Sequence, residues 1–143
     1  MKLNLKKYRD YNAPPFIIAE LSANHKNSLK LALKIIDEVS TTGANAIKIQ
    51  SFLPDEITLN IKNKYFKIND QKSLWNNKYL IDLYNEASTP FDWHRAIFDR
   101  AKKKGLFCFS SVFGDKSFNF LESINAPAYK IASFENNHFP LIE

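Results

Sequence analysis

Four short apolar runs alternate with helical patterns along the chain, and this alternation restricts the fold more than any other feature. The runs are residues 16–20, 44–50, 106–109 and 128–132. Between the first two, apolar residues recur at helical spacing, at Leu29, Leu33, Ile36 and Val39. Buried strands separated by amphipathic helices predict an α/β fold with a parallel sheet and helices packed outside it. A doubly wound sheet and a (β/α)8 barrel both have this pattern.

Residues that favour helix ends flank the predicted helices. Asn27 or Ser28 is expected to cap the first helix, and Gly43 is expected to end it in the left-handed region. Thr89, which stands before a proline, is expected to cap a later helix. Asp115 is expected to cap a shorter one that follows the third apolar run.

Residues 51–77 form a polar, lysine- and asparagine-rich stretch in which apolar residues are isolated. We interpret this stretch as a long functional loop, because such loops are uncommon in compact domains unless they build a site or a lid. The sequence contains neither of the glycine motifs that bind dinucleotides or nucleotide phosphates. Those two versions of a parallel α/β protein therefore have no support.

The composition removes some classes of partner and leaves others open. The chain has 143 residues and a net charge of +5, which permits a nucleic acid, an acidic lipid or a phosphorylated metabolite. Its densest basic group, residues 102–104, stands at a predicted helix end without alternating aromatic residues, so no nucleic acid partner is expected. No apolar run approaches the roughly 20 residues that span a bilayer, and residues 1–12 lack a secretory apolar segment. We therefore expect a cytoplasmic protein with no membrane partner.

Polar side chains interrupt the apolar runs near their carboxyl ends, although buried parallel strands are normally almost continuously apolar. They are Glu20 in the first run, Lys48 and Gln50 in the second, Ser110 and Ser111 after the third, and Lys130 in the fourth. Parallel strands bring such groups to one edge of the sheet, where barrel enzymes have their active sites. Glu20 and Glu135 could balance charge, transfer protons or contact a metal, and sequence spacing does not separate these roles.

Two of these residues are lysines next to isoleucines. Lys48 lies between Ile47 and Ile49, and Lys130 precedes Ile131. Both lysines are therefore expected to point away from the outward apolar face and into one cavity. Two ammonium groups near serine hydroxyls suit a phosphate or carboxylate ligand. For either lysine alone, a salt-bridged or surface-reaching position is an equally good explanation.

The histidines and the cysteine are less informative. His94 lies in a helical stretch and is expected to be a surface or packing residue, and His138 is in a terminal loop. Asn24 and His25 directly follow the first strand, so a place in the site and a place in the packing are equally well supported for His25. The single cysteine, Cys108, lies in an apolar run and is expected to be a small core residue.

Four ordered motifs resemble those of the sialic acid synthase family. They are ELSANH at residues 20–25, KIQ at residues 48–50, FSSVF at residues 109–113 and PAYKIASFE at residues 127–135. Each motif alone is weak, but the four follow four predicted strands in order, and the resemblance covers the chain from Pro15 onward. Within the family, the segments FKI (66–68), SLW (73–75), LYNEA (83–87) and TPFDWH (89–94) look more like pseudaminic acid synthase than N-acetylneuraminate synthase.

The resemblance implies a barrel enzyme, a transferase that condenses phosphoenolpyruvate with the open-chain aldehyde of an N-acetylated amino sugar to make a nonulosonic acid. It implies that phosphoenolpyruvate is bound by Lys48, Ser111, Lys130 and Ser133, and that Glu20, Gln50 and Glu135 face the sugar, a metal or its water. Further candidates for lining the site are Asn24, His25 and Ser110. The implied cofactor is a divalent metal, Mn²⁺ or Mg²⁺, which would polarise the aldehyde. Ser111 and Val112 depart from the threonine and proline that family members often have at these positions.

A complete barrel of this kind takes about 250 residues. We therefore expect this chain to be the N-terminal half, about four βα units, of a TIM (β/α)8 barrel. Residues 1–15 would be a lead-in, and residues 16–143 a partial barrel truncated after its fourth strand. The metal-binding histidines would then lie in the missing half, and the chain would work as a homo-oligomer or with that half. Another barrel enzyme, such as an aldolase, and a non-catalytic anion-binding half-barrel stay open as alternatives.

Overall fold

A computed structural model of the protein describes residues 6–10 and 12–143, so residues 1–5 and 11 of the expected lead-in lie outside the described residues. Four parallel strands form one sheet in the order β1-β2-β3-β4. The strands are β1 (Ile18–Glu20), β2 (Ala46–Ser51), β3 (Phe107–Val112) and β4 (Tyr129–Ile131). The predicted parallel α/β sheet is confirmed. Its strand order advances in one direction, without the reversal that defines a doubly wound sheet.

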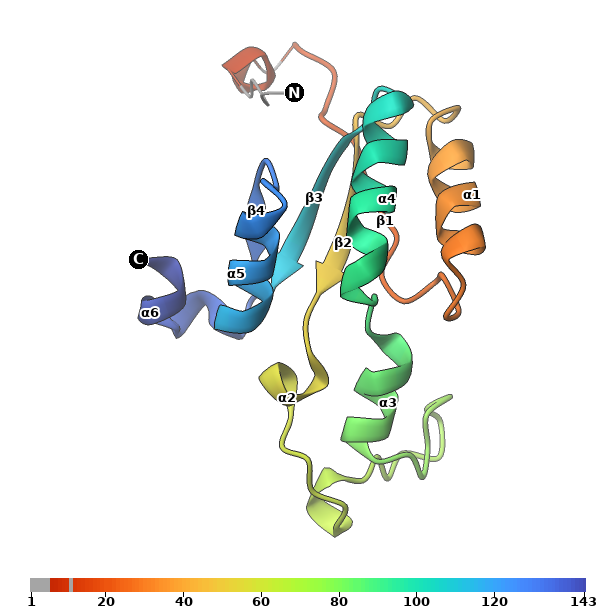
Figure 1. Cartoon of the computed structure of the whole chain (residues 1–143), viewed down its shortest axis with the longest axis vertical. Helices are drawn as coiled ribbons and strands as arrows, with labels where there is room; N and C mark the ends of the chain where they lie inside the picture. The colour runs from red at the N-terminus through yellow and green to blue at the C-terminus, as the bar shows by residue number, and fades with distance from the viewer. Residues whose placement is uncertain (1–5, 11) are drawn as a thin grey trace.

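The main helices connect consecutive strands and pack on one face of the sheet (Figure 1). They are α1 (Leu29–Val39), α4 (Phe91–Lys103) and α5 (Asp115–Ser123). The remaining elements are η1 (Lys6–Arg9), α2 (Pro54–Ile57), η2 (Lys64–Phe66), α3 (Leu80–Ala87), η3 (Glu135–Asn137) and α6 (Phe139–Ile142). The elements α2 and α3 lie beyond the carboxyl end of β2 (Figure 1). The expected long loop, residues 51–77, thus contains the short helical elements α2 and η2, and its Lys67 forms an antiparallel bridge with Tyr79 just beyond it.

The two faces of β2 pack in different buried clusters. Ile47 and Ile49 point toward the helices and pack in one buried cluster with Ile36 of α1 and Ile97 of α4. Cys108 belongs to the same cluster, and burial raises the pKa of its thiol to about 12, so the thiol stays protonated as a core residue. On the opposite face of the sheet, a smaller buried cluster is formed by Ala46, Phe107 and Phe109. The alternation of residues along β2 therefore occurs as predicted.

The expected helix caps are confirmed in one case and wrong in two. The Ser28 hydroxyl accepts a hydrogen bond from the Leu31 amide and caps α1. Thr89 does not cap α4, because its hydroxyl is directed to the His25 ring, 3.3 Å away. Asp115 does not cap α5 and is instead its first residue, because a carboxylate from another segment, that of Glu56, accepts the orphan amide of that helix.

Helix α1 ends before Gly43, at Val39. Three hydroxyls donate to carbonyls of its last turn and complete their hydrogen bonding: Ser40 to Asp37, Thr41 to Glu38 and Thr42 to Val39. Gly43 then has the expected positive φ of 83°, in the turn that leads to β2. Within the described part of the chain, no helix is long and apolar enough to cross a membrane.

Candidate functional site

Five of the polar residues singled out in the sequence share the sheet face on which the main helices do not pack. The strand register pairs Glu20 with Lys48, Gln50 with Ser111, and Ser111 with Lys130. Paired residues of neighbouring strands point to the same face, and this face is opposite to that of Ile47 and Ile49. The register therefore brings charged and hydroxyl side chains from four strands together at the carboxyl end of the sheet. We call this set of residues (Glu20, Lys48, Gln50, Ser111 and Lys130) the open-face cluster.

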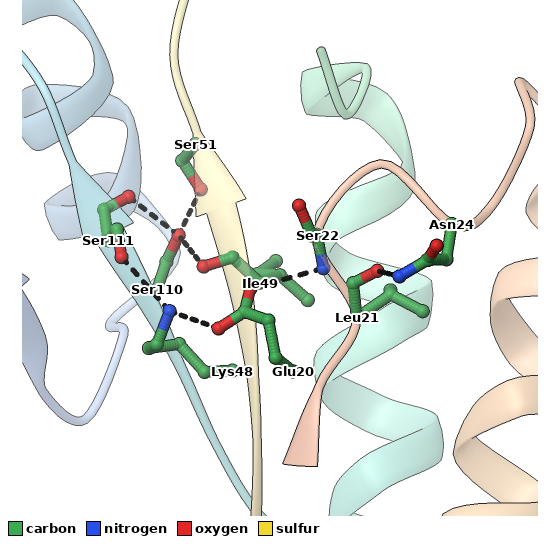
Figure 2. Close-up of polar contacts among 9 residues, drawn as sticks. All are labelled: Glu20, Leu21, Ser22, Asn24, Lys48, Ile49, Ser51, Ser110 and Ser111. Carbon is green, nitrogen blue, oxygen red and sulfur yellow. Dashed lines mark hydrogen bonds and ion pairs between the residues drawn. The ribbon is translucent and has the colours of Figure 1, made fainter. Parts of the chain in front are cut away.

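Lys48 is the centre of the contacts in the open-face cluster (Figure 2). Its ammonium group forms an ion pair with the Glu20 carboxylate and donates a hydrogen bond to the Ser111 hydroxyl over 3.3 Å. The other Glu20 oxygen accepts from the Ser22 amide at 3.1 Å. The Lys48 side chain is only 16% exposed, against 39% for Glu20, so the ammonium lies at the base of the cluster. Of the roles left open for Glu20, charge balance is the one present in these contacts.

The segment that follows β4 carries the remaining predicted residues. Lys130 and Ser133 are exposed, and Glu135 begins η3. The Oε2 atom of Glu135 is buried, and no hydrogen-bond partner for it exists among residues 6–10 and 12–143. Buried carboxylate oxygens are almost always paired, so this atom is one that needs a donor or a cation.

Ser110, one of the candidates for lining the site, does not lie with the open-face cluster. It pairs with Ile49, points toward the helices and is completely buried. The reason is the alternation of side chains along a strand, which sends Ser110 and Ser111 to opposite faces.

Asn24 and His25 shape the loop after β1. The Asn24 amide donates to the Leu21 carbonyl at 2.9 Å. His25 is completely buried, and its Nδ1 accepts from the Asn27 amide at 3.1 Å. Its ring packs edge-on against Trp93, and burial lowers its pKa. Of the two places considered for His25, the structure shows the one in the packing.

A buried polar chain on the helix-covered face was not predicted. The Ser51 hydroxyl lies 2.6 Å from the Ser110 hydroxyl and 2.6 Å from Nε2 of His94, and all three side chains have no exposed area. His94 Nδ1 lies 3.0 Å from the Pro90 carbonyl oxygen. His94 is thus the packing residue expected from its helical position, with a hydrogen-bonding role as well. The sequence signal for this polar chain was a serine at each of two helix-facing strand positions, Ser51 and Ser110, where strands normally carry apolar residues.

Glu56 was also missed, and it joins two segments at the carboxyl end of the sheet. Its carboxylate accepts from the Leu53 amide at 2.8 Å and from the Ser117 amide, in the first turn of α5, at 2.9 Å. Beside it, Lys116 and Asp55 form an ion pair of 2.7 Å. These contacts hold α2 against the start of α5. No local pattern signals them, because the residues concerned are about sixty positions apart in the sequence.

The described residues do not assemble a metal centre of their own. Across residues 6–10 and 12–143, no three histidine, cysteine, aspartate or glutamate side chains come together as a group that could hold a metal ion. The side chains of the open-face cluster carry ammonium, hydroxyl, amide and carboxylate groups, and groups of these kinds can bind anions and transfer protons.

The fold and this cluster define a parallel α/β protein with ammonium, hydroxyl and carboxylate groups gathered at the carboxyl end of its sheet. The chain belongs to the NeuB family, whose model matches residues 35–143. The family membership expected from the four motifs is confirmed.

Several relatives share this region. The chain is 49% identical over 122 residues to pseudaminic acid synthase from Campylobacter jejuni strain 81-176, covering 85% of this chain and 35% of the relative. It is 45% identical to pseudaminic acid synthase from Helicobacter pylori, over 91% of this chain and 38% of that one. The crystal structure of N-acetylneuraminic acid synthetase from Leptospira borgpetersenii, in complex with citrate, superposes with a TM-score of 0.74 at 30% identity, over 92% of this chain and 40% of that chain. The chain thus spans well under half the length of these relatives.

Proposed function

We propose that this chain forms the phosphoenolpyruvate-binding part of a nonulosonic acid synthase of the pseudaminic acid type. The observation that carries the proposal is the placement of Lys48, Ser111 and Lys130 on one uncovered sheet face, in a chain 45–49% identical to pseudaminic acid synthases. Phosphoenolpyruvate carries a phosphate and a carboxylate close together. Two ammonium groups with adjacent hydroxyls match that distribution of charge.

In this proposal, the lysines and serines bind the anion and the carboxylates handle protons and sugar hydroxyls. Lys48 and Lys130 neutralise the phosphate and carboxylate of phosphoenolpyruvate, with Ser111 and Ser133 as hydroxyl donors. C3 of phosphoenolpyruvate attacks the aldehyde carbon of the amino sugar, water adds at C2, and the C2–oxygen bond to phosphate breaks. The lysine charges stabilise the departing phosphate.

Glu20, Gln50 and Glu135 are the groups proposed to face the sugar and the attacking water. Of these three residues, Glu135 has the strongest support for contacting a ligand, because its buried Oε2 has no hydrogen-bond partner within the described residues. A carboxylate oxygen in that state can accept a hydrogen bond from water or from a sugar hydroxyl. Gln50 shares the open face with Ser111 and offers both a donor and an acceptor to a polar sugar.

We also propose that the sheet is half of a (β/α)8 barrel, formed by residues 16–143 after a lead-in at residues 1–15. The support is the sequential strand order and the placement of the helices on one face, which leaves the other face for a barrel interior. The divalent metal implied by the resemblance finds no three-ligand site within the described residues. The roles proposed above are for this chain's own side chains, and the metal ligands are expected in the part of the protein outside this chain.

The test is an assay of the protein encoded by the complete reading frame. Phosphate release from phosphoenolpyruvate is measured with manganese and a 2,4-diacetamido-trideoxy hexose. The wild type is expected to release phosphate only when the sugar is present. Lys48→Ala is expected to lower kcat/KM by about 10- to 100-fold, because a charge-assisted contact to the substrate is lost. The matched control is Lys34→Ala, which removes an exposed lysine of α1.

The outcome separates the proposal from the two alternatives. Sugar-independent phosphate release, or equal activities of Lys48→Ala and Lys34→Ala, would contradict the proposal. Borohydride trapping of a carbonyl substrate on Lys48 or Lys130 would instead indicate a Schiff-base aldolase. Binding of phosphoenolpyruvate without any turnover would indicate an anion-binding module.

A further inference from the structure

The buried chain of Ser110, Ser51 and His94 has a single consistent direction. The Pro90 oxygen is a carbonyl and only accepts, so the proton of the neutral His94 ring lies on Nδ1. His94 Nε2 is then an acceptor, and the Ser51 hydroxyl donates to it over 2.6 Å. With its only proton used, Ser51 accepts from the Ser110 hydroxyl, also over 2.6 Å. The Ser51 proton thus goes to His94 and the Ser110 proton to Ser51, while the Ile49 and Ser111 carbonyl oxygens lie 3.2 and 2.9 Å from the same Ser110 hydroxyl and compete for its proton.

The hydrogen-bonded series Ser110–Ser51–His94 joins three elements near the carboxyl ends of β2 and β3. Ser51 ends β2, Ser110 lies in β3, and His94 is in the first turns of α4. The Ser110 hydroxyl is also within 3.2 Å of the Ile49 carbonyl. The contacts therefore fix the separation and the relative height of the two strand ends against the helix.

We infer that Ser51, Ser110 and His94 are positioning residues that hold Gln50 and Ser111 in place on the opposite face of the sheet. This inference rests on the proposed function, because it deepens the account of the same site. Ser51 directly follows Gln50, and Ser110 directly precedes Ser111 (Figure 2 shows both serines and Ser111).

The strand geometry transmits this constraint. Gln50 and Ser111 are register partners, and consecutive residues of a strand point to opposite faces. A shift of either buried serine therefore moves the Cα atom of the site residue beside it. The hydrogen bond from Lys48 to Ser111, at 3.3 Å, depends on the same strand end.

The choice of residue types supports a positioning role over a role in stability. The neighbours of this chain on the helix-covered face are apolar, among them Ile47, Ile49 and Val112. Apolar residues of similar volume at buried polar positions are often as stabilising as a satisfied polar network. What a fully satisfied network adds is one defined arrangement, because its hydrogen bonds are directional.

The test compares kinetic constants in the protein from the complete reading frame. Ser51→Ala and Ser110→Ala each break the chain, while Ile97→Val removes one buried methyl group from the same side of the sheet and serves as the control. Each serine variant is expected to raise KM for phosphoenolpyruvate by about 10- to 100-fold, the scale of a small misplacement of binding groups. The double variant is expected to show the same KM as the single ones, because the chain is broken once. Ile97→Val is expected to lower the melting temperature without changing KM.

Each result decides between a positioning role and a structural one. KM does not depend on the fraction of folded protein, so a loss of stability alone leaves it unchanged. If an alanine variant does not fold, Ser51→Cys keeps the volume with a weaker donor and is expected to raise KM by a smaller factor. An unchanged KM in a folded Ser51 variant, with the wild type active, would overturn this inference and leave the proposed function intact. A wild type without sugar-dependent turnover would overturn both.

Discussion

His94 is a buried residue whose protonation is coupled to the stability of the fold. Burial lowers its pKa from 6.5 to about 4. In the unfolded chain the imidazole takes up a proton as the pH falls below about 6.5, whereas in the folded protein it stays neutral down to about 4. The unfolded state therefore binds more protons within this window, and the free energy of unfolding decreases as the pH falls through it.

This difference in the pKa of His94 predicts that the free energy of unfolding falls by about 3 kcal/mol between pH 7 and pH 4. The figure follows from about 1.36 kcal/mol for each unit of pKa difference between the folded and unfolded states. Urea unfolding measured at intervals between these pH values would show it. In His94→Gln the slope should be smaller, because the titrating group is gone. The control is His138→Gln, at an exposed position near the end of the chain. Equal slopes in His94→Gln and the wild type would show that His94 is not buried as a neutral ring.

At the residue scale, the sequence predicted which strand residues share a face but not which residues they contact. Lys48 and Lys130 were placed on the uncovered face because isoleucines alternate with them, and period-two alternation follows from strand geometry. The same rule, applied at Ser110 and Ser111, separates the two serines, although their adjacency suggested one site. The partners of Ser51 and His94 come from tertiary packing, which has no local signal.

Glu56 and Gly114 show how an element depends on a side chain from elsewhere. The start of α5 has no cap of its own, and Glu56 provides the acceptor for the Ser117 amide. A Cβ atom on Gly114 would lie 2.6 Å from Glu56 Oε1. That distance is too short for non-bonded atoms, so Gly114→Ala would push the carboxylate away from the helix start.

We predict that Gly114→Ala lowers the free energy of unfolding by about 1–3 kcal/mol, the range for a buried donor that loses its acceptor. In a Glu56→Ala background, the same substitution should cost clearly less, because no carboxylate remains to be displaced. A double-mutant cycle by urea unfolding measures this coupling. Additive effects of the two substitutions would contradict the proposed contact.

At the element scale, strands and helices were predictable where a periodic pattern extended over several residues, and their ends were not. The third strand was expected to stop at Phe109 but continues to Val112, because Ser110 is accommodated by buried hydrogen bonds. The start of α4 was expected at a Thr89 cap, but that hydroxyl lies against His25 instead. Helix and strand ends are decided by which tertiary partner satisfies the backbone, and the sequence does not display that partner.

At the scale of the whole molecule, the main helices pack on one face of the sheet only, and the edge strands β1 and β4 each have a strand partner on one side among the described residues. Large apolar residues are exposed on β1 and in the segment after β4, among them Ile18, Phe134 and Phe139. Strand edges and apolar surface of this kind favour association. The sequential sheet was predictable from the βα alternation, but the apolar packing on its second face was not, because residues such as Phe16 and Phe107 that meet there are far apart in the sequence.

We predict that the 143-residue chain alone is catalytically silent and associates with itself or with the other half of a barrel. The basis is its coverage of only 35–38% of the pseudaminic acid synthases that it resembles. Light scattering coupled to size exclusion should give a mass above that of one chain, 16.6 kDa. A monomeric chain that sustains phosphate release above its own Lys48→Ala variant would contradict this prediction.

The most direct measurement of the central claim is calorimetric titration of phosphoenolpyruvate into the protein from the complete reading frame and into its Lys130→Ala variant. Lys102→Ala, at the exposed end of α4, is the matched control. If the open-face cluster binds the anion, Lys130→Ala should raise the dissociation constant for phosphoenolpyruvate by about 10- to 100-fold, because one charged contact is lost. Lys102→Ala should bind phosphoenolpyruvate as the wild type does. Equal affinities in all three proteins would contradict the assignment of this face as the phosphoenolpyruvate site.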